Sequence, residues 1–167
     1  MIEQAFLKYS ADHLLTLSGR IEDCLGRLTD DRVWDRSCEN HNAVGNIVLH
    51  LCGNIRQWII GGVGGAPDVR DRDAEFAARD GLTPAELAAR LKATVSEATE
   101  VIRNLPVERL TERKVIQKVY EQTLMEAIYH VVEHFAQHTG QIIFATKLLT
   151  GDDLGYYKHL NKASSHG

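Results

Sequence analysis

The sequence has no long apolar segment and few cysteines or prolines. Its 167 residues include three cysteines, three prolines and two methionines. The longest apolar stretches are interrupted by His50, Asn54 and Arg56 in one place and by Glu133 and His134 in another. No run of roughly 20 apolar residues that could cross a membrane is therefore present. The first residues carry charges of both signs without an apolar segment, so a signal peptide is not expected.

The few cysteines and the small net charge indicate the cellular compartment and exclude some classes of binding partner. Cys24, Cys38 and Cys52 are odd in number and form no C-x-x-C pair. This pattern is typical of free thiols in a reducing cytoplasm and argues against a disulfide framework. A formal net charge of −4 provides no general attraction for nucleic acid or anionic lipid. The composition therefore predicts a cytoplasmic globular protein that binds neither nucleic acid nor membrane.

Four segments show the three- and four-residue apolar spacing of amphipathic helices. Asn42 is a favourable N-cap for the second of them, and the glycines after Ile60 end it. Thr83 and Thr123 each stand three residues before a glutamate, which is the capping-box pattern of a helix start. The predicted helices span about residues 2–28, 43–60, 83–104 and 123–150.

The long connections between these helices favour a bundle with crossovers. Residues 61–82 and 105–122 exceed the roughly 2–8 residues that join helices in a simple up-down bundle. Only residues 114–120 (KVIQKVY) alternate as a strand does, and one short strand cannot form a sheet, so we expect an extended segment there. The predicted fold is all-α: a four-helix bundle with long crossover connections in one domain over residues 1–155, followed by a polar tail over residues 156–167.

Three of the eight histidines recur at strict four-residue intervals: His130, His134 and His138. Neighbours in this row are offset by about 6 Å along a helix, so two of them can bind one cation. The outer pair is about 12 Å apart, beyond one coordination sphere. Either the first two or the last two are therefore the chelating pair. On the second helix, His50 borders the apolar stripe and can supply a third ligand from a facing helix.

Other polar residues near these histidines are candidates for lining the site or for hydrogen bonding to its ligands. These candidates are Asn54, Gln57, Glu133, Gln141 and, in the loop before the second helix, His41. A solvated helix face is an equally valid interpretation of Glu133 and Gln141. Arg70 and Arg72 are candidates for binding the carboxylate of a cosubstrate, although alternating charges also form surface ion-pair networks.

Two other interpretations of these histidines do not involve this metal site. Residues 130–134 read H-V-V-E-H, which matches the H-x-x-E-H of inverzincin proteases. Those enzymes are larger, two-lobed proteins with a further acidic ligand, for which a 167-residue helical chain offers little room. The histidines could also be purely structural and pack along the helix without an ion.

The chain resembles the DinB/YfiT-like superfamily of metal-dependent enzymes over nearly its whole length. The resemblance rests on NAVGNIVLHLCGNIRQWI, GGVGGAPDVRDRDAEF and HVVEHFAQHTGQI. The segment from His138 to Gln141 is similar to the His-x-Gly-Gln ending of that family, which implies that His50, His134 and His138 are the metal ligands. His130 then lines or supports the site. Thr139 stands where the family often has arginine, so one cation near the site is missing.

The resemblance also implies a non-sequential helix order, a homodimer and a divalent metal ion, nickel or zinc, with iron or manganese as alternatives. Three neutral histidines leave an ion its full charge and an open position, as in catalytic zinc sites. Such an ion deprotonates a coordinating thiol and lowers the pKa of bound water.

Characterised relatives are S-transferases and isomerases that use bacillithiol, mycothiol or glutathione. We therefore expect a small-molecule substrate and a metal-dependent transferase acting with a low-molecular-weight thiol. The alternatives are a metal-dependent hydrolase and a non-catalytic metal-binding stress-response protein.

Overall fold

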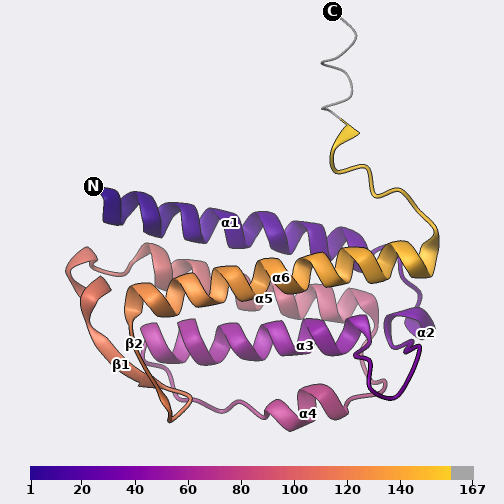
Figure 1. Ribbon diagram of the computed structural model, residues 1–167, viewed down its shortest axis with the longest axis horizontal. Helices are drawn as coiled ribbons and strands as arrows, with labels where there is room; N and C mark the ends of the chain where they lie inside the picture. The colour runs from indigo at the N-terminus through magenta and orange to yellow at the C-terminus, as the bar shows by residue number, and fades with distance from the viewer. Residues whose placement is uncertain (159–167) are drawn as a thin grey trace, which may run out of the picture.

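Four long helices pack around one hydrophobic core in the computed structural model, which describes residues 1–158 (Figure 1). Shorter helices, a π-helical segment and a β-hairpin connect them. In chain order the elements are α1 (Ile2–Leu25), α2 (Asp30–Val33), α3 (Val44–Ile55), the π-helix η1 (Arg56–Val63), α4 (Arg72–Ala77), α5 (Pro84–Arg103), the 3-10 helix η2 (Val107–Thr111), β1 (Arg113–Ile116), β2 (Tyr120–Thr123) and α6 (Leu124–Thr150).

The helices follow one another around the bundle in an order that differs from their order in the chain. Both α1 and α3 pack against α5 and α6, so α1 and α3 lie on opposite sides of the bundle. Going round the bundle, the order is α1, α5, α3, α6 (Figure 1). Two connections cross the bundle, one from α1 to α3 and one from α5 to α6. The predicted all-α bundle with crossovers and non-sequential order is confirmed.

The capping boxes mark the starts of the last two long helices correctly. The Thr83 side chain accepts a hydrogen bond from the Glu86 N–H, and Glu86 accepts one from the Thr83 N–H over 2.8 Å. Thr123 and Glu126 form the same pair at the start of α6. These reciprocal bonds satisfy N–H groups that have no partner within the helix.

The boundaries of the first two long helices differ from the expected ones. Helix α1 ends three residues early because Thr29 caps the separate helix α2, accepting a hydrogen bond from Arg32 N–H. Ala43, not Asn42, is the N-cap of α3, and the Asn46 side chain accepts from the Ala43 N–H over 3.2 Å. At its other end α3 continues as η1 to Val63, through the first two glycines of GGVGG.

The prediction of a single extended segment over residues 114–120 was wrong. Strands β1 and β2 pair antiparallel, with Arg113 opposite Thr123 and Ile116 opposite Tyr120. The turn between them places Gln117 and Lys118 at φ 54° and 65°. Turns with this left-handed conformation usually contain glycine or asparagine, because other residues seldom adopt it. Neither residue type occurs between the two strands, so the sequence contains no signal for a hairpin turn.

The C-terminal segment contacts the bundle at its start. The Tyr156 hydroxyl lies 3.0 Å from Asp23 Oδ2 and 3.1 Å from the Arg20 carbonyl oxygen, both on α1. Residues 159–167 of the predicted polar tail lie outside the described residues. Within residues 1–158, no helix combines the length and apolar character that crossing a membrane requires.

Candidate metal centre

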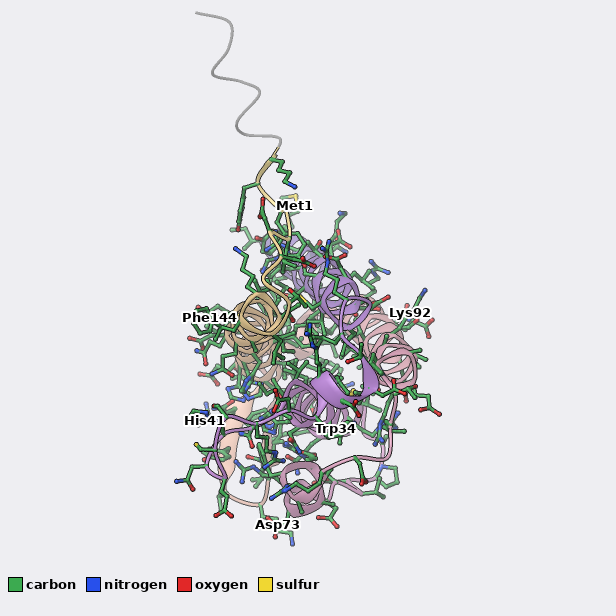
Figure 2. The ribbon with its side chains drawn as sticks, turned by 90° about the vertical axis from the view of Figure 1, so that its right-hand side faces the viewer. Met1, Trp34, His41, Asp73, Lys92 and Phe144 are labelled. Atoms are coloured by element: carbon green, nitrogen blue, oxygen red, sulfur yellow. The ribbon has the colours of Figure 1, made fainter. Side chains whose placement is uncertain are left out.

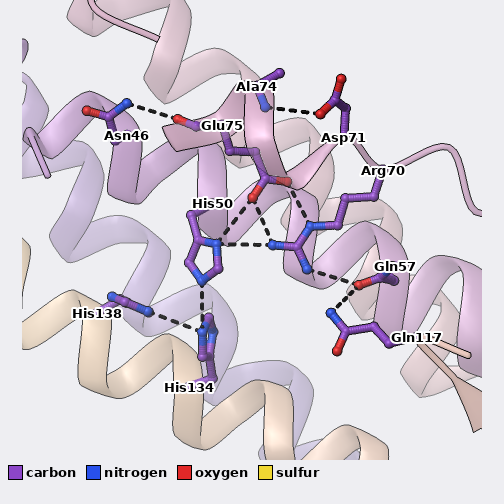
Figure 3. A network of polar contacts seen from close by, with 10 residues as sticks. All are labelled: Asn46, His50, Gln57, Arg70, Asp71, Ala74, Glu75, Gln117, His134 and His138. Carbon is purple, nitrogen blue, oxygen red and sulfur yellow. Dashed lines mark hydrogen bonds and ion pairs between the residues drawn. The ribbon is translucent and has the colours of Figure 1, made fainter. Parts of the chain in front are cut away.

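Three histidine side chains from two helices meet between α3 and α6 (Figure 3). The Nε2 atom of His134 lies 3.1 Å from that of His50 and 3.2 Å from that of His138. One ring nitrogen from each residue lies within 4.8 Å of the other two. Of the two pairs that the spacing left open, the structure brings His134 and His138 together with His50.

Each histidine lies at the edge of the buried stripe of its helix. His50 immediately precedes Leu51, and His134 immediately precedes Phe135, and both of these apolar residues are fully buried. Consecutive residues of a helix are about 100° apart around its axis. A residue next to a fully buried one therefore lies beside the core, and here the imidazoles lie where α3 and α6 meet. His50 is 7% exposed, whereas His134 and His138 are half-buried. The cluster is therefore reachable from one side.

Hydrogen bonds at Nδ1 orient two of the three rings. His50 Nδ1 donates to Glu75 Oε2 over 3.2 Å, and His138 Nδ1 donates to Gln141 Oε1 over 2.7 Å. Carboxylate and amide oxygens only accept hydrogen bonds, so Nδ1 carries the proton in both rings. Their Nε2 atoms are consequently unprotonated and directed at His134.

This donor set fits a divalent cation. His50 and His138 both present unprotonated Nε2 atoms to His134, and a neutral His134 can donate a proton from Nε2 to only one of them. A cation among the three nitrogens would satisfy the lone pairs that one hydrogen bond leaves without a partner. Nitrogens bound to one ion at about 2.0–2.1 Å lie roughly 3 Å apart, close to the two separations observed here. Imidazole ligands suit zinc, nickel, copper and iron. His50, His134 and His138 could therefore hold such an ion.

Burial favours the neutral form of the two α6 histidines, His134 and His138. Burial first, and the neighbouring His138 and His50 rings next, lower the pKa of His134 to about 3. Burial also lowers the pKa of His138, although its hydrogen bond to Gln141 opposes the change. A metal ion binds only the neutral imidazole, so these pKa values favour binding at neutral pH.

Glu75 of α4 holds His50 and is held in turn by Arg70. Arg70 donates from Nε to Glu75 Oε1 and from Nη2 to Glu75 Oε2, each over 2.8 Å. Burial raises the pKa of Glu75, but the hydrogen bonds from Arg70 and His50 outweigh burial and lower it overall. The Arg70 Nη2 atom lies 3.0 Å from His50 Nδ1, because both donors share Glu75 Oε2 as acceptor.

The polar network continues from Arg70 to the hairpin (Figure 3). Arg70 Nη1 donates to Gln57 Oε1 over 3.0 Å, and Gln117 Nε2 donates to the same oxygen over 2.6 Å. Gln57 Nε2 also donates to Asp68 Oδ2 over 2.7 Å. Gln57 thus links the hairpin turn and the segment before α4 to the carboxylate that orients His50.

Close contact between α3 and α4 brings Glu75 to the cluster. The Asn46 side chain donates to the carbonyl oxygens of Glu75 and Ala78, each over 2.9 Å. At Gly53, a Cβ atom would lie 2.7 Å from the Glu75 carboxyl carbon and closer still to Oε1. The lack of a side chain at Gly53 therefore allows the carboxylate to reach His50.

Other predicted residues lie beside the cluster or away from it. The His130 ring lies 5.7 Å from that of His134 and 4.3 Å from that of Trp58, measured between centroids. Asn54 is buried, and its Oδ1 has no hydrogen-bond partner in the described part of the chain. Glu133 is exposed and lines a separate groove with His130.

His41 and Gln141 line the same groove next to the cluster. Gln141 joins this groove to the centre through its hydrogen bond with His138. His41 is exposed, and its Nδ1 hydrogen bonds with the Ser37 hydroxyl in the same loop.

The two arginines predicted for anion binding are both engaged. The Arg70 side chain is 3% exposed, and Glu75 already neutralises it. The guanidinium of Arg72 lies 4.8 Å above the centre of the Phe76 ring. Arg70 is therefore part of the hydrogen-bond network that holds His50, and Arg72 packs on Phe76.

Sequence reasoning missed Glu75, which contacts a candidate ligand directly. The segment RDRDAEF signals a charged, exposed stretch, and no spacing rule relates position 75 to position 50. A buried histidine that binds a metal needs an acceptor for its second nitrogen, so His50 indicates that an acceptor exists but not where in the sequence it lies.

Comparisons with known proteins agree with the helical fold. The structure is similar to the crystal structure of the conserved protein of locus from Enterococcus faecalis, with a TM-score of 0.73 and 17% sequence identity, covering 87% of this chain and 97% of the other. At this identity the likeness shows the fold alone. None of the curated proteins matches the sequence. Residues 1–161 match the family described as Protein of unknown function (DUF1572), and the chain therefore belongs to the DUF1572 family.

Proposed function

We propose that the protein is a metal-dependent S-transferase of the DinB/YfiT-like type that acts with a low-molecular-weight thiol, with His50, His134 and His138 as metal ligands. One observation carries the proposal: the Nε2 atoms of three histidines from α3 and α6, those of His50 and His138 unprotonated, converge at a point that is open on one side. When bound there, a divalent cation supplies Lewis acidity and stabilises a thiolate at neutral pH. Three imidazole ligands suit nickel or zinc, which the resemblance favours, as well as iron, and manganese is a further alternative that the resemblance implies.

Residues around the three histidines fix the orientation and the protonation of two of the ligand rings. Glu75 and Gln141 hold the Nδ1 protons of His50 and His138, which fixes both rings and leaves Nε2 free. Such outer hydrogen bonds typically change metal affinity about 10–100-fold. Phe76 packs its ring 4.9 Å from that of His50 and excludes water from that side.

The position of the acidic residues favours thiol transfer over hydrolysis. Glu133, the acidic residue nearest in sequence to the α6 ligands, is exposed and lines another groove. Glu75 is paired with Arg70 and His50. A hydrolase often adds a carboxylate general base to its metal-bound water, and neither of these two glutamates is an unpaired carboxylate within the cluster. A thiol that a cation deprotonates outright needs no such base.

Metal content and turnover test this proposal. The protein purified without a histidine tag should contain one divalent ion per chain, and His50→Ala and His138→Ala should lose it. His13→Ala is the control, because His13 is on α1 and stacks on Tyr9 outside the cluster. The metal-loaded protein should conjugate bacillithiol, mycothiol or glutathione to monochlorobimane, and chelation should abolish the reaction. Absence of the ion would overturn the proposal, and an ion without thiol turnover would favour ester hydrolysis or a non-catalytic role.

A further inference from the structure

A groove of about 520 Å³ lies beside the three histidines. Its walls are the start of α3, the second half of α6 and the loop over residues 35–42. His41 and Phe144, from two of these walls, lie on the same side of the molecule (Figure 2). Small-molecule sites occupy roughly 300–1,000 Å³, so the groove has the size of a ligand site.

The groove has apolar walls and a polar, uncharged rim. Phe144 and Leu148 are 64% and 71% exposed on α6, facing the apolar Val44 and Ile47 of α3. Ser37, Asn40, His41 and Asn42 form the rim. The charged lining residues, Asp35 and Arg36, have opposite signs. This lining suits an uncharged apolar group better than an anion or a cation.

The groove continues into the three-histidine cluster. Gln141 belongs to both, because it lines the groove and accepts a hydrogen bond from His138 over 2.7 Å. His138, Gln141, Ala145 and Leu148 follow one another at three- and four-residue steps, so they share one face of α6. On α3, Ile47 lies one turn before His50. A molecule whose polar end reaches the histidines would therefore place its remainder in the groove.

We infer that this groove binds the apolar part of the electrophilic substrate that receives the thiol, and that this substrate is an uncharged amphiphile whose polar, reacting end lies at His50, His134 and His138. The inference rests on the proposed metal centre. The concave shape and the shared Gln141 favour a small molecule over a second copy of the chain. Exposed Phe144 and Leu148 are then explained, since the bound apolar group covers them.

Hydroxamates of two lengths test the inference on zinc-loaded protein. Acetohydroxamate and octanohydroxamate present the same metal-binding head, and the second adds six methylenes. Calorimetry should show octanohydroxamate binding at least about tenfold more tightly, because part of its chain is buried. The variant Phe144→Ser, Leu148→Ser should lose most of this gain and keep its affinity for acetohydroxamate. Tyr129→Ser is the matched control, since Tyr129 is 61% exposed on α6 outside the groove.

The outcomes separate the two proposals. Equal affinities of the wild-type protein for both hydroxamates, or a gain that survives both serine substitutions, would overturn the groove while leaving the metal centre in place. A wild-type dimer in sedimentation that the serine variant converts to monomer, without any chain-length effect, would assign the groove to subunit contact and also overturn the inference. Failure to retain zinc, with neither hydroxamate bound, would overturn the metal centre and the groove inference with it.

Discussion

The position of one proton decides whether His50 can act as a metal ligand. The Glu75 carboxylate accepts from His50 Nδ1 and leaves Nε2 unprotonated. A glutamine at position 75 has an amide that can donate to Nδ1, which would move the proton to Nε2. Glu75→Gln should therefore lower metal affinity about 10–100-fold, measured by competition with a chromophoric chelator. Glu97→Gln, which removes the exposed pair with Arg56, should match the wild type. Unchanged affinity in Glu75→Gln would refute this role.

The three cysteines should differ in thiol reactivity. Burial raises the pKa of Cys52 to about 11, so this thiol has very little thiolate at pH 8. Cys24 is also buried, whereas Cys38 is exposed. Ellman's reagent should label Cys38 rapidly in the folded protein and the other two only after denaturation. Cys38→Ser should lack the rapid phase, and its persistence in that variant would contradict the burial of Cys24 and Cys52.

At this scale the sequence predicts residue types better than their partners. The four-residue spacing showed that two neighbouring histidines of α6 could bind one cation. Only the resemblance to the DinB/YfiT-like superfamily indicated that these two are His134 and His138. Gln141 lies three residues from His138 on the same helix, so its contact was predictable. Glu75 depends on how α4 docks 25 residues away from His50, and no local pattern encodes that.

At the scale of helices, the contact between α3 and α4 should be sensitive to a single methyl group. Gly53→Ala would place a carbon where the Glu75 carboxylate lies, so the carboxylate and α4 must move away from His50. We expect a lower melting temperature and weaker metal binding. Gly140→Ala is the control, because its Cβ meets nothing within 4 Å, and it should raise stability by about 0.5–1 kcal/mol. A Gly53→Ala variant with wild-type metal affinity would argue against the required close approach.

Helix boundaries were predictable where side chains determine them. Thr83 and Thr123 satisfy the first N–H groups of α5 and α6, and both starts were placed correctly. Ala43 has no capping side chain, and its N–H donates to Asn46 inside the helix. The predicted start of α3 was therefore one residue too early. The hairpin was missed because Gln117 and Lys118 adopt a turn conformation that their side chains disfavour.

For the whole molecule, the half-buried histidines of α6 should make the metal-free protein sensitive to mild acid. The pKa values of His130, His134 and His138 lie below their ordinary value, which is near 6.5 in the unfolded chain. The unfolded chain therefore binds more protons below about pH 6.5, and stability falls as the pH decreases toward about 3. In EDTA, the melting temperature should be lower at pH 5.5 than at pH 7.5.

Variants assign this acid sensitivity to the cluster. His134→Gln removes a buried titrating group and should show a smaller decrease in melting temperature between pH 7.5 and 5.5. His13→Gln, on the α1 helix, should retain the full decrease. A decrease of the same size in His134→Gln would attribute the acid sensitivity to other groups.

The two candidate ligands on different helices, His50 and His134, are 84 residues apart, about half of the 167-residue chain. A ribosome still making α6 holds an incomplete ligand set, so the ion can be captured only after synthesis of that helix. The hydrophobic core is formed by all four long helices without any contribution from the ion. If the three histidines bind an ion, a chain made during metal scarcity would fold first and take up the metal later, without new protein synthesis.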